Sequence, residues 1–351
     1  ENVLVSNKAH NIHCLVNYDA FIIENDSLIE AYAKRVVKYI SEQYYKSIQR
    51  YTTSHECHAC ILKLERMLED LNVKLSKVYL GAEIIGDRYI VEECIGEGSF
   101  GRVKVAYDKI TGEKVAVKEL DLEQVRKLGI EDFVEREHEI MKQISSAPDA
   151  HENIVKWYDY IEEDDVIHIV LEYCANGPLE RPDEEHEQFS EQKAHDYFVQ
   201  IISALDYLHT RHHVMHRDLQ LCNICTTDKD VVKIVDFGVA DYFVPNEQKH
   251  TLFAGNVNYV PPEMTLTKRY VGPEIDTWSA GVCLYKMVTG YLPFRRVSDI
   301  LIGKFSIPLE EEHDLSEECK DLIRHILNPD AAKRYTIPMI KEHPWFKATT
   351  I

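Results

Sequence analysis

The chain has 351 residues, of which 60 are Asp or Glu and 40 are Lys or Arg, so its formal net charge is −20. This acidity argues against nucleic acid and anionic membranes as partners of the whole surface and favours basic peptides, although a high negative charge also serves solubility alone. With 45% hydrophobic residues the chain can bury a full core, and its length accommodates one large folded unit and a small appendage.

The nine cysteines are scattered over the chain without the pattern of a disulfide framework. This usage indicates a reducing compartment, and we expect the protein in the cytoplasm. No apolar run reaches transmembrane length, and no signal peptide is visible. Two Cys-x-x-Cys pairs, Cys57 with Cys60 and Cys222 with Cys225, raise the alternative of zinc binding. Because neither has a second pair at metal-ligand spacing, we do not favour zinc at either place.

Residues 1–83 carry two amphipathic helical patterns. Between residues 27 and 49, one helical face is apolar. Between residues 61 and 78, apolar side chains that include Leu68 and Leu71 repeat at heptad spacing. We therefore predict a helical N-terminal extension that binds a protein partner or self-associates. The patterns leave open whether the helices pair as a hairpin, dock on the neighbouring domain or dimerise.

A glycine-rich turn follows the extension, with Gly96, Gly98 and Gly101 in Gly96-Glu97-Gly98-Ser99-Phe100-Gly101. Glycines at this spacing let backbone N–H groups approach phosphate oxygens, because no Cβ stands in the way. The spacing alone fits an ordinary tight turn equally well. However, apolar and polar side chains alternate from Tyr89 to Glu93 and from Val103 to Tyr107. The turn is therefore predicted to join two strands, unlike the strand-to-helix turn of a dinucleotide-binding fold.

Lys118 ends the sequence Val115-Ala116-Val117-Lys118, which is typical of a strand that buries the lysine stem and directs the ammonium toward phosphates. A buried cation needs an anionic partner. The next amphipathic stretch, residues 131–144, is predicted to be helical and carries the candidate carboxylates Glu135, Glu137 and Glu139. The pattern alone leaves the choice among these three glutamates open.

Two further motifs suit phosphoryl transfer. Asp218 and Asn223 lie in His216-Arg217-Asp218-Leu219-Gln220-Leu221-Cys222-Asn223, and Asp236 opens Asp236-Phe237-Gly238. An aspartate can accept the proton of an attacking hydroxyl or orient it, and amide and carboxylate oxygens can hold Mg²⁺ on phosphates. A turn aspartate is the ordinary alternative for Asp218, but the spacing of all three residues argues against it.

In this order and context, the motifs resemble the eukaryotic protein kinase family over residues 89–346. The resemblance implies an α+β, two-lobed protein kinase fold, with a small, mostly β lobe over residues 89–172 and a large, mostly α lobe over residues 177–346. It also implies ATP and Mg²⁺ as cofactors and serine or threonine hydroxyls of proteins as acceptors. Short strings such as Asn176-Gly177-Pro178-Leu179 resemble the calcium/calmodulin-dependent protein kinase kinases, within the wider calcium/calmodulin-dependent and AMP-activated group.

The resemblance also assigns roles to residues. It selects Glu137 as the partner of Lys118 and makes Asp218 the catalytic aspartate, with Lys118, Glu137 and Asn223 completing the catalytic set. Asn223 and Asp236 become the metal ligands. Val103 and Ala116 would form the roof of the adenine pocket and Cys225 its floor, while the Glu172 carbonyl and the Cys174 amide would contact adenine. The implied nucleotide-binding set is Gly96, Gly98, Gly101, Val103, Ala116, Lys118, Glu172, Cys174 and Cys225.

The resemblance predicts several supporting contacts outside the reacting groups. His216, Phe237 and Met141 would stack as an internal spine. Asp276 would support the catalytic loop from a buried helix. Elsewhere in the large lobe, Glu263 would pair with Arg334, and Ser190 would open a long amphipathic helix.

Three residues depart from the family pattern. Gln220 replaces the lysine usual in serine/threonine kinases, which removes a charge near the γ-phosphate. Asn256 replaces a threonine that normally helps tie the activation segment to the catalytic aspartate, and Pro178 removes a common acidic contact to substrate. Because the five core residues are intact, we expect an active enzyme; the alternative is a weak pseudokinase that acts as a nucleotide-binding scaffold. If the missing charge limits the chemistry, Gln220→Lys should raise kcat.

Regulation by phosphorylation has one candidate residue in the activation segment. Thr251 lies four residues before Gly255, and Arg217 is a ready partner for a phosphate there. Against this, the spacing differs by one residue from the more usual threonine, and Glu247 already supplies a negative charge on the same segment. We therefore expect that activity does not depend on Thr251.

Overall fold

The computed structural model describes residues 83–98, 101–180, 188–245, 247, 249–250, 255–267, 269–270, 272–307 and 315–348. The interaction element predicted for residues 1–83 falls outside these ranges apart from Glu83, and so do Thr251 and the Cys57/Cys60 pair. The chain divides into two compact units. The first comprises Glu1–Glu97 and Arg102–Val115, and the second comprises Gly98–Gly101 and Ala116–Ile351.

Three strands form the described part of the first unit, in the order β1 (Ile84–Ile85), β2 (Tyr89–Gly98) and β3 (Gly101–Asp108). β1 and β2 are antiparallel, with Ile85 opposite Tyr89, and both side chains are buried. The Arg88 guanidinium donates to both carboxylate oxygens of Asp108, at 2.8 and 2.7 Å, and so joins the start of β2 to the end of β3. The prediction that the glycine-rich turn joins two strands is confirmed.

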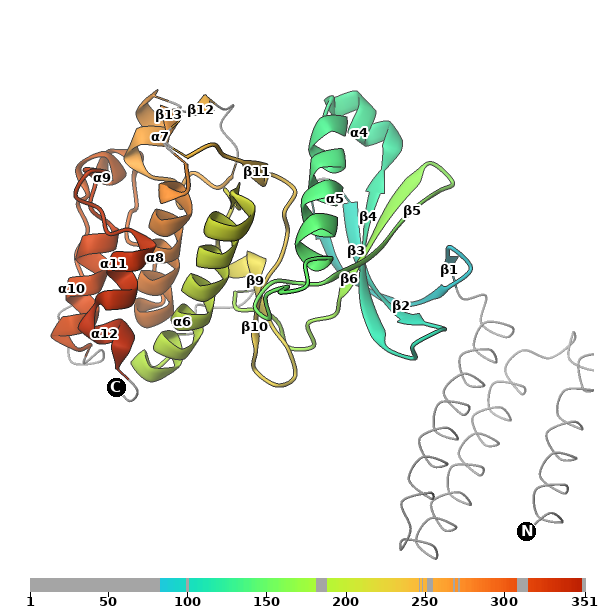
Figure 1. Ribbon diagram of the computed structural model, residues 1–351, viewed down its shortest axis with the longest axis horizontal. Helices are drawn as coiled ribbons and strands as arrows, with labels where there is room; N and C mark the ends of the chain where they lie inside the picture. The colour runs from blue at the N-terminus through green and yellow to red at the C-terminus, as the bar shows by residue number, and fades with distance from the viewer. Residues whose placement is uncertain are drawn as a thin grey trace, which may run out of the picture. The chain divides into compact units, whose positions relative to one another are not determined.

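The second unit begins with strands in the order β4 (Lys114–Asp121, from Ala116 on), β6 (Val166–Glu172) and β5 (Trp157–Glu163). Two helices lie between β4 and β5 in sequence, α4 (Leu122–Leu128) and α5 (Glu131–Ser145). β5 and β6 are antiparallel, with Tyr160 opposite Ile169. Val134 of α5 packs in one apolar cluster with Ile169 of β6, so α5 covers this sheet (Figure 1). The helix predicted for residues 131–144 is confirmed.

The longer elements among the remaining described residues are helices. They are α6 (Glu191–Tyr207), α7 (Pro262–Thr267), α8 (Glu274–Thr289), α9 (Val297–Ile302), α10 (Glu317–Ile326), α11 (Ile337–Glu342) and α12 (Pro344–Lys347), with a π-helical turn, η2 (Leu208–His212), after α6. The Ser190 hydroxyl accepts from the Lys193 N–H at 3.3 Å and caps α6, as predicted. The predicted pairing of Glu263 with Arg334 is confirmed as two hydrogen bonds of 2.7 and 2.9 Å.

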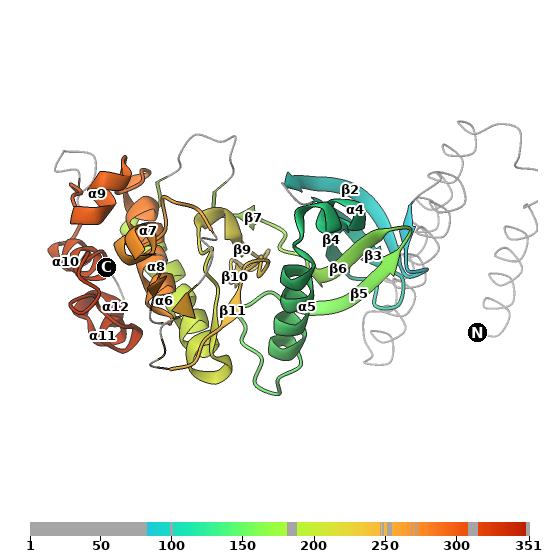
Figure 2. The same cartoon turned by 90° about the horizontal axis from the view of Figure 1, so that it is seen from above.

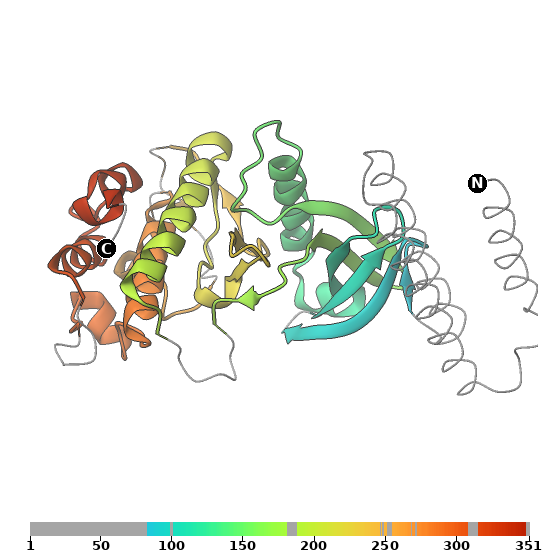
Figure 3. The same ribbon diagram turned by 90° about the horizontal axis from the view of Figure 1, so that it is seen from below.

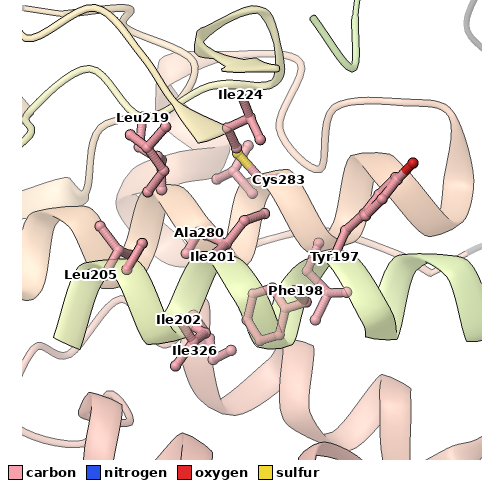
Figure 4. Packing of buried hydrophobic residues seen from close by; sticks show 14 of the residues in the cluster. Tyr197, Phe198, Ile201, Ile202, Leu205, Leu219, Ile224, Ala280, Cys283 and Ile326 are labelled. Carbon is pink, nitrogen blue, oxygen red and sulfur yellow. The ribbon is translucent and has the colours of Figure 1, made fainter. Parts of the chain in front are cut away.

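The main core lies where α6 packs on α8 (Figure 2 and Figure 3). In α8 every residue from Ile275 to Thr289 is buried, which explains why this helix is hydrophobic around its whole circumference. Figure 4 shows Ile201 and Leu205 of α6 near Ala280 of α8, with Ile224, the first residue of a short strand, in the same cluster. This core forms a rigid base for the loops that carry the polar motifs.

Short strands hold those loops in place. β7 (Gly177–Pro178), β9 (Ile224–Thr226) and β10 (Val232–Ile234) form a sheet in the order β10-β9-β7. β8 (Val214–Met215) pairs with β11 (Asp241–Tyr242), and β12 (Lys249–His250) pairs with β13 (Arg269–Tyr270). The segments that carry Asp218, Asn223 and Asp236 therefore run between paired strands. Across the part of the chain that the structure describes, no helix has the length and apolar character needed to cross a membrane.

Candidate active site

The Lys118 ammonium contacts two carboxylates. Its Nζ lies 2.7 Å from Glu137 Oε1 and 2.9 Å from Asp236 Oδ1. The Glu137 side chain is only 5% exposed, whereas Glu135 and Glu139 are exposed on the same helix. The position of α5 thus brings one of the three candidate glutamates to Lys118, because the other two lie on the solvent face of the helix.

The Lys118 ammonium and the Asp236 carboxylate stabilise each other's charge. Burial opposes the charge on Lys118, but Asp236 and Glu137 outweigh it, so the pKa of Lys118 is raised above its ordinary value. The nearby ammonium lowers the pKa of Asp236 in turn. At neutral pH the site therefore holds a charged lysine beside an ionised Asp236.

Asp218 is held through both oxygens of its carboxylate. Oδ1 accepts from the Asn256 backbone N–H at 3.1 Å. Oδ2 accepts from Gln220 Nε2 and from Asn223 Nδ2, each at 3.0 Å. Burial raises the pKa of Asp218, and the donated hydrogen bonds and nearby His216 oppose that rise. These three donors fix the orientation of the Asp218 carboxylate.

The backbone of the loop before Asp218 is anchored on α8. Buried Asp276 accepts from the backbone N–H groups of His216 and Arg217, at 2.9 and 2.8 Å, and from His209 Nε2 at 2.8 Å. Burial would raise the pKa of Asp276, but the hydrogen bond and charge of His209 outweigh it, and the pKa is lowered. Arg217 has a φ of 68°, a conformation that costs free energy in a non-glycine residue and persists because this anchor imposes it. The predicted support of the loop by Asp276 is confirmed.

One contact of the predicted internal spine is confirmed. The rings of His216 and Phe237 meet edge to face with centroids 5.0 Å apart. Met141 and Phe237 are buried in the same apolar core. The ring contact therefore links the loop before Asp218 to the Asp-Phe-Gly segment, and Met141 of α5 lies in the same core as Phe237.

Arg217 has a carboxylate partner within the protein. Its Nη1 lies 3.2 Å from Asp241 Oδ2, and Arg136 Nε lies 3.8 Å from Asp241 Oδ1. The Arg217 side chain is only 3% exposed, so Asp241 supplies the counter-charge of a buried cation. Sequence reasoning missed Asp241, since one aspartate in a polar segment carries no signal of its partner.

Asn223 and Asp236 suit a divalent cation. Because Asn223 Nδ2 donates to Asp218, its amide oxygen is directed away from that bond. Asp236 Oδ1 accepts hydrogen bonds from Lys118 Nζ and from the Gly238 N–H. The Asp236 side chain is 47% exposed. An amide and a carboxylate oxygen are the donors that Mg²⁺ takes beside phosphate oxygens. Among the described residues there is no group of three or more His, Cys, Asp or Glu able to hold a metal, Cys222 and Cys225 included.

The predicted nucleotide-binding residues fall into both units. Gly96 and Val103 belong to the first, while the remainder, Gly98, Gly101, Ala116, Lys118, Glu172, Cys174 and Cys225, belong to the second. Gly101 is required where it stands, because a Cβ there would lie 1.7 Å from the Glu119 carbonyl oxygen. The side chains of Cys174 and Cys225 meet, and this hydrogen bond, followed by burial, raises the pKa of the Cys225 thiol. Cys174, expected to contact adenine, and Cys225, the proposed pocket floor, are thus neighbours.

Comparisons with known proteins show which sequences this chain is similar to. A family model for the protein kinase domain matches residues 89–346. The chain is 37% identical over 286 residues to the probable serine/threonine-protein kinase MARK-A of Dictyostelium discoideum, which covers 78% of this chain and 25% of that protein. It is 36% identical over 266 residues to the serine/threonine-protein kinase SIK1 of Mus musculus, which covers 74% and 33%. For the serine/threonine protein kinase OSK3 of Oryza sativa subsp. japonica the identity is 37% over 265 residues, which covers 74% and 50%. The chain thus spans between a quarter and a half of the length of these relatives.

Proposed function

The chain belongs to the protein kinase family, and we propose that the whole protein phosphorylates proteins in a signalling cascade, upstream of other enzymes. Its kinase domain is of the serine/threonine type, uses ATP with a divalent metal ion and has the expected two-lobed α+β fold. The observation that carries the proposal is the contact of Lys118 with both Glu137 and Asp236. Phosphoryl transfer needs these three groups together, because the reaction depends on positioning and on charge stabilisation.

Each polar residue of the site has a part in the proposed mechanism. Asp218 orients the acceptor hydroxyl and takes its proton, and its hydrogen bonds from neighbouring amides support this role. Lys118 binds the phosphates of ATP, and Glu137 holds its ammonium in place. When bound, Mg²⁺ neutralises the charge that develops on the phosphoryl oxygens, and Asn223 and Asp236 hold it there.

Glu172 and Cys174 are the proposed partners of the adenine end of the nucleotide. The Glu172 carbonyl and the Cys174 amide would hydrogen-bond adenine, and Ala116 and Cys225 would line its pocket. The contact between Cys174 and Cys225 supports a common surface for these two residues. Gly96, Gly98 and Gly101 cover the phosphates, and the absence of a Cβ at each supports this role.

Finer assignments complete the proposal. The Pro178 and Leu179 string supports a place near the calcium/calmodulin-dependent protein kinase kinases within the wider group that the relatives represent. The acidic composition supports basic protein substrates, with nucleic acid not a partner. Cysteine usage supports a cytoplasmic location. Residues 1–83 form the interaction element, the domain spans residues 89–346, and its lobes cover residues 89–172 and 177–346.

Phosphate transfer into a mixed peptide library tests the activity. With Mg-ATP, the protein should label serine and threonine, and Asp218→Asn should label neither. Asp228→Asn is the matched control, because Asp228 is exposed. A folded wild-type protein that binds ATP and transfers no phosphate would support the alternative of a nucleotide-binding scaffold. The intact charged cluster and the kinase relatives do not favour that alternative.

A further inference from the structure

Gln220 and Asn256, the two residues that depart from the family pattern beside Asp218, contact each other. Asn256 Nδ2 donates to Gln220 Oε1 at 3.1 Å, and Gln220 Nε2 donates to Asp218 Oδ2 at 3.0 Å. The Asn256 backbone N–H donates to Asp218 Oδ1 at 3.1 Å. These three hydrogen bonds close a ring through both oxygens of the carboxylate and both amide side chains.

The activation segment approaches the catalytic loop closely at this ring. Gly255 has a φ of 96°, and a Cβ there would lie 2.6 Å from the Arg217 carbonyl oxygen and 3.2 Å from Asp218 Oδ1. Only glycine permits this approach. After it, Asn256 Oδ1 accepts from the Asn258 N–H at 3.0 Å, which holds the Asn256 side chain in a local turn. The orientation of the Asn256 amide toward Gln220 is therefore constrained from both sides.

The ring uses a property that only amide side chains have. An amide carries a donor and an acceptor on the same group, so Gln220 can donate to Asp218 and accept from Asn256 at once. A lysine ammonium has donors only. A lysine at position 220 would place a donor opposite the Asn256 Nδ2 donor. Asn256 Nδ2 would then have lost its acceptor. A threonine hydroxyl at position 256 could accept from such a lysine.

We propose that Gln220 and Asn256 are a matched pair of positioning residues, which together hold the Asp218 carboxylate against the activation segment without a cation. Neither residue reaches the phosphates in this role; both act through Asp218. The proposal deepens the proposed kinase function, on which it rests. It reverses the expectation for Gln220→Lys, because the single exchange breaks the ring as well as adding a charge.

A four-protein cycle tests the pairing: wild type, Gln220→Lys, Asn256→Thr and the double variant. Each single exchange should lower kcat by roughly tenfold, because Gln220→Lys leaves Asn256 Nδ2 without its acceptor and Asn256→Thr removes the amide donor that orients Gln220. The KM for ATP should stay within about twofold, because neither residue binds the nucleotide. The double variant, which restores complementary donors and acceptors, should return to within about threefold of the wild-type kcat. Gln124→Lys, the same charge change on an exposed helix position, should change nothing.

Hydrogen exchange provides a readout that does not depend on activity. The amide of Asn256 should exchange faster in both single variants and regain protection in the double variant. Faster exchange in the singles with recovery in the double supports the pairing even if the wild type transfers no phosphate, which would refute only the proposed function. Additive losses of kcat, unchanged exchange in the single variants, or a higher kcat in Gln220→Lys would each overturn the pairing.

Discussion

Lys118, Glu137 and Asp236 form a small network in which one cation serves two carboxylates from different elements. Lys118 on β4 is charged because Asp236 and Glu137 lie close to it. Asp236 is ionised because the Lys118 ammonium lies close to it. Asp236 also adopts a φ of 61°, which is uncommon for a residue with a side chain. A strained, charged residue at the end of a packed spine is typical of a functional position.

A substitution at Asp236 tests the metal-binding role. Asp236→Asn should keep the fold and lower Mg-ATP turnover by at least about a hundredfold, because an uncharged ligand replaces the carboxylate on the metal. Steady-state phosphate transfer measures the loss, and circular dichroism with thermal unfolding verifies the fold. Asp228→Asn, an exposed aspartate of the same unit, should retain full turnover. Near-normal turnover by folded Asp236→Asn would show that another group binds the metal.

At the scale of single elements, side-chain contacts hold neighbouring strands together. In the first unit, the bidentate contact of Arg88 with Asp108 joins β2 to β3, and the Ile110 N–H and Thr111 hydroxyl add bonds of 2.9 and 3.0 Å to the same carboxylate. Burial tends to raise the pKa of Asp108, but these bonds outweigh it and lower the pKa to about 2. The strand pair is therefore stabilised by an ionised aspartate.

The lowered pKa of Asp108 predicts a defined pH dependence. Because its folded value lies below the ordinary value of 3.8, the stabilisation is present above pH 3.8 and is lost as the pH falls toward 2. Asp108→Asn should cost about 2 kcal/mol at neutral pH and about half of that near pH 3. Urea unfolding of both proteins at several pH values measures the difference. Asp87→Asn, an exposed change in the same turn region, should show no such trend, and an Asp108 effect that stays constant with pH would refute the assignment.

The segment after Asp236 explains why activity should not depend on Thr251. Arg217, the cation expected to bind a phosphate on this segment, already contacts Asp241. Thr251→Ala should therefore retain most of the activity of the purified protein, as measured by peptide phosphorylation. The reverse result, a collapse of activity together with phosphate on wild-type Thr251, would make the enzyme dependent on phosphorylation.

On the scale of the whole molecule, the chain joins a kinase domain to a preceding segment with its own amphipathic patterns. Two apolar faces left exposed would form a large hydrophobic surface, which soluble proteins normally cover. We therefore expect residues 1–83 to be covered by a partner, by the kinase domain or by a second copy of the chain.

Charges placed on the heptad seam test this expectation. Leu68→Glu with Leu71→Glu should disrupt self-association or release the segment, because each glutamate would bury an unpaired charge. Light scattering and limited proteolysis measure the effect. The control is a double exchange of Arg66 and Glu69 to alanine, which lie outside the apolar repeat and together leave the net charge unchanged. An unchanged oligomeric state and an unchanged cleavage pattern in the leucine variant would indicate a passive leader.

The motif residues and their order could be predicted from the sequence, because short local patterns specify them. The strands around the glycine-rich turn, the helix over residues 131–144 and the contact between Glu263 and Arg334 agree with those predictions. The choice of Glu137 needed a family resemblance, and in the structure it rests on which helix face is buried.

Other contacts were decided only by the tertiary structure. Asp241 lies 24 residues from Arg217, and Asn256 lies 36 residues from Gln220. Neither pair shares a strand or a helix, so no periodicity in the sequence relates its members. The close approach of Gly255 to Asp218 places Asn256 beside Gln220, and the pairing of β11 with β8 places Asp241 beside Arg217. Two substitutions that look like separate losses in the sequence are thus one contact in the fold, because hydrogen bonds depend on distance in space and not along the chain.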